Sequence, residues 1–181
     1  MKHLTILLLA WLTAFQAGQD IYICKNAKIN MYSSAPIEDI EGNSTQAVSV
    51  YKASTGELSF SLPIRSLHFE KSLMEEHFNE NYMESDKYPK ATFKGKIQSP
   101  PDISKDGTYP VNLTGDLEVH GVKQTRTIKG EIKVSGGTIS MTSEFFVKCA
   151  DHKIDIPQIV FHHIAENIRV RVAATYAPYK N

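Results

Sequence analysis

The chain has 181 residues, with 20 basic and 20 acidic side chains and a hydrophobic fraction of 41%. This composition is that of a globular protein of one ordinary domain, and not of a disordered tail or a disulfide-dense miniprotein. The balanced charge argues against nucleic-acid binding, since nucleic-acid-binding proteins carry a basic excess that neutralises phosphates.

The first residues have the pattern of a secretory signal peptide. Lys2 precedes an apolar run over residues 4–15, and small and polar residues follow at 17–19. The run is too short to cross a bilayer, which takes about 20 apolar residues. We therefore predict a signal peptide over residues 1–19, a single mature domain over residues 20–181, and a periplasmic or secreted location.

Two cysteines, Cys24 and Cys149, lie far apart in the chain. An exported location permits a disulfide between them, and two buried free thiols are the alternative. The sequence leaves this choice open.

Alternation of apolar and polar residues with a period of two dominates after residue 25, which is typical of half-buried strands. The rows are clearest over residues 58–65, 109–120, 139–149 and 168–172, with shorter candidates at 29–32, 47–53, 92–97 and 125–134. Glycine-rich turns separate them. Gly136-Gly137 is the clearest hairpin, because both central positions of a type I′ turn need positive φ. About eight antiparallel strands of this kind predict an all-β sandwich or closed barrel, and the interior of a barrel is either filled or wide enough for one small ligand.

One segment breaks the strand pattern. Residues 72–75, Ser-Leu-Met-Glu, have the spacing of a capping box at a helix start. The large apolar side chains that follow recur every fourth residue and fall on one helical face: Met74, Phe78 and Tyr82. We predict a short helix over residues 73–81 and a second short helix near residues 161–167.

Candidate polar chemistry is sparse. The histidines offer one adjacent pair, His162-His163, whose side chains point apart in an extended segment, so we predict no metal site. The sequence has no Gly-x-Ser-x-Gly elbow and no glycine-rich phosphate loop. His120 is interpreted as a polar-face residue beside a glycine turn, and Ser143, next to an apolar row, is the single hint of an enzyme. We interpret the helix carboxylates as a solvated face: Glu75, Glu76, Glu80 and Glu84.

Three blocks of sequence together resemble one known family. They are residues 69–96, which include Tyr-Pro-Lys-Ala-Thr-Phe-Lys-Gly-Lys, residues 113–130, which include Leu-Glu-Val-His-Gly-Val, and residues 154–157 ahead of a terminal strand. These blocks resemble the YceI-like family, the exported lipid- or polyisoprenoid-binding proteins of bacteria, while residues 32–40 depart from its usual opening. The resemblance implies an extended antiparallel lipocalin-like β-barrel of about eight strands with one or two short helices. It also implies an interior that holds the tail of an isoprenoid or other amphiphile.

The candidate binding residues are the large apolar side chains of the inferred inward rows and of the helix. Such residues fill cores more often than they hold ligands, yet an apolar lipid needs this kind of lining. The candidates are Phe60, Leu62, Phe69, Met74, Phe78, Tyr82, Phe93, Val111, Leu113, Leu117, Met141, Phe145, Ile168 and Val170.

These observations favour a non-catalytic protein that carries or sequesters an isoprenoid-like or other amphiphilic lipid, with no cofactor and no nucleic-acid partner. Two alternatives stay open. One is an envelope scaffold or partner-binding protein with a filled core, and the other is a lipid-modifying enzyme. The sequence leaves open the identity of the lipid, transient contact with a membrane and the formation of a homodimer.

Overall fold

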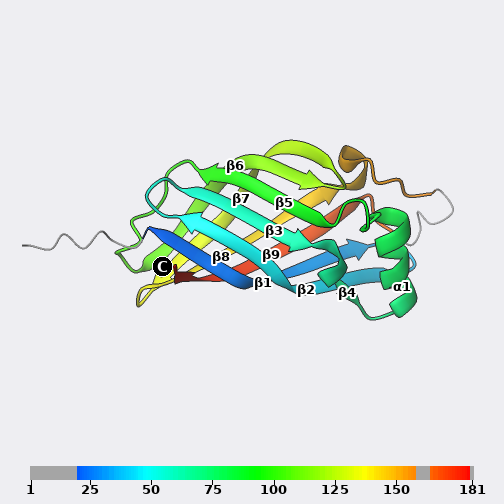
Figure 1. Cartoon of the computed structure of the whole chain (residues 1–181), viewed down its shortest axis with the longest axis horizontal. Coiled ribbons are helices and arrows are strands. Elements are labelled where there is room, and N and C mark those ends of the chain that lie inside the picture. Colours follow the sequence, from blue (N-terminus) through cyan, green and yellow to red (C-terminus); the bar gives the residue numbers. More distant parts are fainter. Residues whose placement is uncertain (1–19, 158–163, 180–181) are drawn as a thin grey trace, which may run out of the picture.

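The computed structural model describes residues 20–157 and 164–179, which form a closed antiparallel barrel (Figure 1). The strands are β1 (Ile21–Ser34), β2 (Asp39–Lys52), β3 (Glu57–Pro63), β4 (His68–Phe69), β5 (Lys90–Ile97), β6 (Gly107–Val119), β7 (Val122–Ser135), β8 (Thr138–Lys148) and β9 (Asn167–Pro178). Eight of them follow the order β1-β9-β8-β7-β6-β5-β3-β2, and β2 pairs back with β1 to close the ring. The two-residue strand β4 adds to β2. The predicted all-β barrel of about eight strands is therefore confirmed.

The first two strands are longer than the sequence pattern indicated. β1 shifts its register against β2 twice between Cys24 and Ile29. Because a bulge inserts an extra residue, it changes which residues face inward, and Cys24 and Ala27 are both buried although they differ in parity. The alternation with a period of two is lost there, and sequence analysis found only residues 29–32 of this strand.

Glycine is required at two sites of the barrel, and the first is the predicted hairpin. Gly136 and Gly137, between β7 and β8, have φ of 54° and 78°, as the predicted hairpin requires. On β6, Gly115 is paired with Gly95 of β5, and a Cβ at Gly115 would lie 2.3 Å from the Gly95 Cα. The two strands therefore approach closely at a bend that excludes side chains.

The predicted helix is present, but its start is not the predicted one. Helix α1 (Ser72–His77) continues as a π-turn, η2 (Phe78–Tyr82). The predicted capping box is wrong, because Lys71 is the N-cap and no side chain caps the helix. The Glu75 carboxylate instead accepts a hydrogen bond from the Phe69 backbone N–H at 3.1 Å, since β4 ends just before the helix and presents that donor.

Two short 3-10 turns complete the described structure: η1 (Ile64–Ser66) and η3 (Cys149–His152). Of the second predicted helix, residues 161–163 lie outside the described residues. Residues 164–166 are not helical and Asn167 begins β9, so the prediction is wrong for this part. Among the helices of the described residues, none has the length and apolar character needed to cross a membrane.

The cysteines lie at opposite ends of the barrel and are both free and buried. Ile23, next to Cys24, pairs with Ala177 near the end of β9, whereas the Cys149 N–H donates to the Glu166 carbonyl just before β9 begins. Eleven residues of extended chain separate these points by about 35 Å, far beyond the reach of a disulfide. Burial raises the pKa of the Cys149 thiol to about 11, which keeps it protonated at neutral pH.

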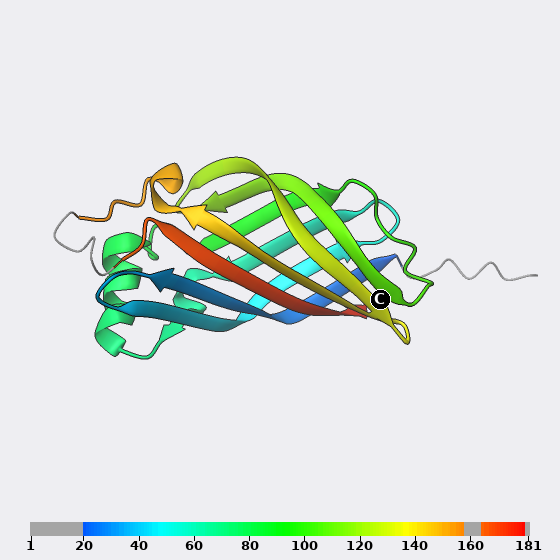
Figure 2. The same ribbon diagram turned by 180° about the vertical axis from the view of Figure 1, so that it is seen from behind.

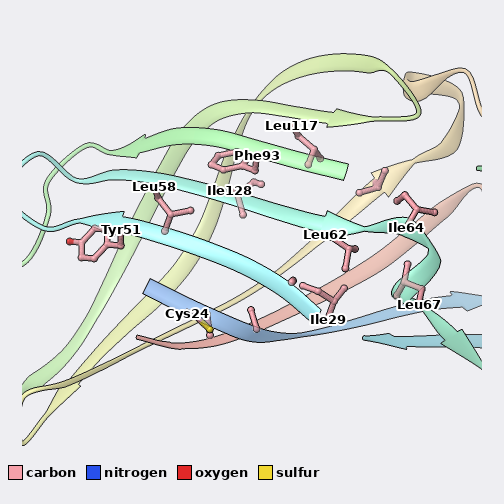
Figure 3. Close-up of a cluster of buried hydrophobic side chains, with 14 of the residues drawn as sticks. Cys24, Ile29, Tyr51, Leu58, Leu62, Ile64, Leu67, Phe93, Leu117 and Ile128 are labelled. Atoms are coloured by element: carbon pink, nitrogen blue, oxygen red, sulfur yellow. The ribbon is translucent and has the colours of Figure 1, made fainter. Parts of the chain in front are cut away.

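The two ends of the barrel differ (Figures 1 and 2). We call the end with the β2–β3 and β7–β8 hairpins the base, and the end with α1, η2 and η3 the rim. At the base, Tyr51, Val134 and Ile139 are almost completely buried. The ring of Tyr51, labelled in Figure 3, contacts the Tyr176 ring edge-on, with the ring centroids 6.2 Å apart, and the Tyr176 hydroxyl lies 2.7 Å from Ser49 Oγ. The base is therefore a packed plug.

Candidate functional site

An apolar cavity of about 250 Å³ lies between the packed base and the rim. Its floor is formed by Ile97, Ile132 and Tyr176. Along β9 the inward side chains from Tyr176 to Ile168 all line it, a distance of about 26 Å along the strand. With the usual tilt of barrel strands, this corresponds to a hollow roughly 20 Å long parallel to the barrel axis.

All fourteen binding candidates from the sequence line this cavity. They come from the wall strands and from the helical segment at the rim. Inward side chains such as Leu58, Leu62 and Phe93 converge on the barrel interior in Figure 3. The wall is almost entirely apolar, so the chemistry that it offers is hydrophobic contact. That these residues bind a ligand stays a prediction.

Sequence analysis missed part of the wall. Strands β1 and β2 contribute Ile29, Met31 and Ile40, and the segment after η3 contributes Ile154 and Ile156. The alternation of Ile29 and Met31 with polar neighbours was a usable signal for the first strand. The short segment after η3 had no periodic signal.

One stretch of the wall is hollowed by small residues. Val172 of β9, Ser143 of β8 and Gly130 of β7 are in register on three neighbouring strands, and all line the cavity. Gly130 has no side chain, and the Ser143 hydroxyl donates to the Lys129 carbonyl oxygen at 2.7 Å. Among the described residues, no histidine or carboxylate hydrogen-bonds Ser143 in the way that an activating base would.

Segment α1–η2 closes one side of the rim. Met74, Phe78 and Tyr82 line the cavity, as their spacing of four predicted, and the Phe78 ring packs on Phe69 with the ring centroids 4.8 Å apart. Burial raises the pKa of Tyr82. Leu73, the neighbour of Met74, points outward and is 59% exposed. The segment therefore has an inner face that contacts the cavity and an outer face in solvent, as a lid requires.

His120 is not the exposed polar-face residue that the sequence indicated, since its side chain is only 10% exposed. Its Nε2 lies 2.8 Å from Glu84 Oε2 and its Nδ1 lies 3.1 Å from the His152 carbonyl oxygen. Glu75 and Glu84 thus hold structural contacts, and interpreting the helix carboxylates as a purely solvated face is wrong for these two. The reason is that loops distant in sequence meet at the rim. Within residues 20–157 and 164–179, no three histidine, cysteine or acidic side chains converge as a metal site.

A closed eight-stranded antiparallel barrel with an elongated apolar interior belongs to the lipocalin-like class of folds. The family model described as "YceI-like domain" matches residues 25–176. The chain therefore belongs to the YceI-like family.

Several solved structures share the fold. A polyisoprenoid binding domain from Saccharophagus degradans, implicated in plant cell wall breakdown, superposes with a TM-score of 0.74 at 14% identity, covering 87% of this chain and 98% of that one. BcnA from Burkholderia cenocepacia gives 0.69 at 15% identity, covering 82% and 95%. The YCEI protein of Campylobacter jejuni gives 0.62 at 19% identity, covering 80% and 88%. A search of curated proteins found no match.

Proposed function

We propose that the protein binds the tail of an isoprenoid-like or other amphiphilic lipid in the barrel cavity, and carries or sequesters it without changing it chemically. The observation that carries this proposal is the elongated apolar hollow of about 250 Å³. At about 24 cal/mol per Å³, leaving such a hollow empty costs about 6 kcal/mol. That is comparable to the whole stability of an ordinary domain, so an apolar occupant is expected.

The shape and chemistry of the cavity favour a chain over a polar or flat ligand. Its long axis suits an extended tail, and its inward side chains offer no ion pair. Burying apolar surface gains about 25 cal/mol per Å² whatever the detailed structure of the tail. We therefore expect affinity with loose selectivity among tails of suitable length. The description of the Saccharophagus degradans domain as polyisoprenoid binding supports an isoprenoid-like occupant.

We also propose that the protein works outside the cytoplasm, in the periplasm or after secretion, because residues 1–19 have the pattern of a signal peptide. Mass spectrometry of the protein from its native cell should then find a chain that begins near residue 20. A lipid carrier must collect its ligand from a bilayer, so transient membrane contact belongs to this proposal. A homodimer stays a prediction, for which sedimentation at several concentrations is the measurement.

Organic extraction of the purified protein, followed by mass spectrometry, tests the binding function. We expect an apolar lipid in a ratio of about one per chain. Phe145→Asp should abolish this, because the side chain lines the cavity, whereas Phe146→Asp should not, because Phe146 is 53% exposed on the outer face of the same strand. Circular dichroism checks that both variants fold.

The alternatives give different results in the same experiment. A filled-core scaffold would yield no lipid from a folded wild-type protein, which would overturn the proposal. An enzyme would convert an added lipid, and loss of that turnover in Ser143→Ala would replace the carrier by a lipid-modifying enzyme.

A further inference from the structure

Three strained backbone positions meet at one place on the rim. The non-glycine residues with positive φ in the described chain are Glu84, His120 and Lys153, at 42°, 51° and 55°. Glu84 follows η2, His120 occupies the β6–β7 turn, and Lys153 ends η3. Non-glycine residues avoid this conformation, and several of them together indicate a site whose surroundings impose it.

The His120 ring joins these three positions. Its Nε2 faces the Glu84 carboxylate at 2.8 Å and its Nδ1 faces the carbonyl of His152 at 3.1 Å. The Tyr88 ring packs against it edge-on, with the ring centroids 4.5 Å apart. Gly121 must lack a side chain here, since a Cβ would lie 2.5 Å from the Tyr88 ring.

The number of hydrogen bonds that the ring makes to its two partners depends on its protonation. A backbone carbonyl and an ionised carboxylate only accept hydrogen bonds. Both bonds therefore form only when both ring nitrogens of His120 carry hydrogen, that is, when the ring is an imidazolium. A neutral ring donates to one partner and presents a lone pair to the other.

Each element that the ring ties continues directly into the cavity wall. Met83 precedes Glu84, Val119 precedes His120, and Ile154 follows Lys153, and all three side chains line the cavity. The contacts of His120 thus bind the end of the lid segment α1–η2 to the β6–β7 hairpin and to η3. We call Glu84, His120 and the His152 carbonyl the rim latch.

We propose that protonation of His120 controls the rim latch. The latch holds the rim of the cavity closed when the ring is charged, and holds it less firmly when the ring is neutral. Its effect on ligand release rests on the lipid-binding function proposed above. The latch is fully made in the imidazolium state and loses one of its two hydrogen bonds when the ring gives up a proton.

Other titratable groups lie close to His120 and its partners. The Glu84 carboxylate faces the ring, and Lys87 Nζ lies 3.7 Å from the other Glu84 oxygen. Tyr88 contacts the ring through its edge. His152 is completely buried and its Nδ1 faces the Val122 carbonyl at 3.0 Å, which assigns it a proton there, while its Nε2 is buried without a partner.

Hydrogen exchange on the ligand-free protein tests the latch directly. The Ser85 and Tyr88 amides, bonded to the Asn79 and Glu84 carbonyls, report on the lid end, and the Ile154 amide, bonded to the Cys149 carbonyl, reports on η3. After correction for the intrinsic rate, protection at these amides should fall by roughly tenfold between pH 6 and pH 8, as expected for the loss of one charge-assisted hydrogen bond. Nitrogen NMR of the ring should show both nitrogens protonated at pH 6.

Matched variants separate the latch from general effects of pH. Asparagine tolerates positive φ but does not titrate, so His120→Asn should give low protection at both pH values. His68→Asn removes an exposed histidine that faces Glu75 at 3.4 Å and should behave as wild type. If His120→Asn does not fold, Glu84→Gln keeps an acceptor oxygen without the charge and should lower protection at pH 6. Wild-type protection that is unchanged by pH would overturn the proposal. So would pH dependence that survives in His120→Asn or, where that variant does not fold, in Glu84→Gln.

Release of the neutral apolar fluorophore N-phenyl-1-naphthylamine links the latch to the cavity. Its dissociation from wild type should be faster at pH 8 than at pH 6, and equally fast at both in His120→Asn. A fluorophore that binds at neither pH would count against the lipid-binding function, while hydrogen exchange still decides the latch. A fluorophore that binds and leaves at a rate independent of pH in wild type would overturn the role of the latch in release.

Discussion

At the scale of single residues, the two tyrosines of the base form a pair with opposite expected behaviour. The Tyr51 hydroxyl oxygen is buried and has no hydrogen-bond partner among the described residues, and burial raises the pKa of Tyr51 to about 12. The Tyr176 hydroxyl bonds Ser49 Oγ, which also donates to the Ser59 carbonyl oxygen. An unpaired buried hydroxyl costs about 1–3 kcal/mol, whereas a made hydrogen bond contributes about 1 kcal/mol.

We therefore expect Tyr51→Phe to raise the free energy of unfolding by about 1 kcal/mol or more, and Tyr176→Phe to lower it by about 1 kcal/mol. Urea unfolding of the two variants beside wild type measures both changes. If Tyr51→Phe were the more destabilising of the two, the plug would owe its stability to a contact of the Tyr51 hydroxyl that the structure does not contain.

At the scale of elements, the sequence predicted the strands and the helix whose determinants lie close together in the chain. Strands β3, β6, β8 and β9 were found because each alternates strictly, one face packing inward and one in water. β1 was mostly missed because its bulge shifts the inward face by one residue. The spacing of four residues predicted the segment α1–η2. The predicted capping box is absent, because the Glu75 carboxylate accepts a hydrogen bond from a backbone N–H of β4 instead.

The sequence contains the fewest patterns from which the structure of the rim could be predicted. His120 looked exposed because its partners come from loops 36 residues before it and 32 residues after it. Hydrogen bonds between such distant loops leave no period in the sequence. Cys24 and Cys149 are likewise free because the strands place them at opposite ends of the barrel, which their spacing in the sequence does not reveal.

The two faces of α1 lead to an element-scale prediction. Met74→Asp places a charge on the cavity side of the lid, while Leu73→Asp changes the neighbouring, 59% exposed residue. We expect Met74→Asp to release the extracted lipid almost completely, because a carboxylate covered by a bound lipid loses its hydration, and Leu73→Asp to retain it. Lipid per chain, measured by mass spectrometry on folded variants, checks this. Equal retention in both would show that α1 does not cover the ligand.

At the scale of the whole molecule, the barrel divides stability and function between its ends. Packed side chains such as Tyr51 and Ile139 fill the base, so the strands are held there without help from a ligand. The hollow towards the rim lacks those contacts, and its closing segments are short turns held by a few hydrogen bonds. Regions of this kind open at lower free energy than the core. A container needs this arrangement, because its opening must move while its wall persists.

Filling the hollow should therefore separate binding from stability. Ser143→Leu adds apolar volume where Ser143 and Gly130 leave the wall thin, at the loss of one hydrogen bond to the Lys129 carbonyl. Each newly buried methylene contributes about 0.8 kcal/mol and the lost bond costs about 1 kcal/mol, so the ligand-free variant should gain roughly 1 kcal/mol in free energy of unfolding. The same leucine should lower bound lipid several-fold, whereas Ser140→Leu, on the outer face of the same strand and outside the cavity lining, should leave it unchanged. Such opposite effects are those expected where function depends on an unfilled site. Full lipid binding by a stabilised Ser143→Leu protein would instead place the ligand away from this part of the cavity.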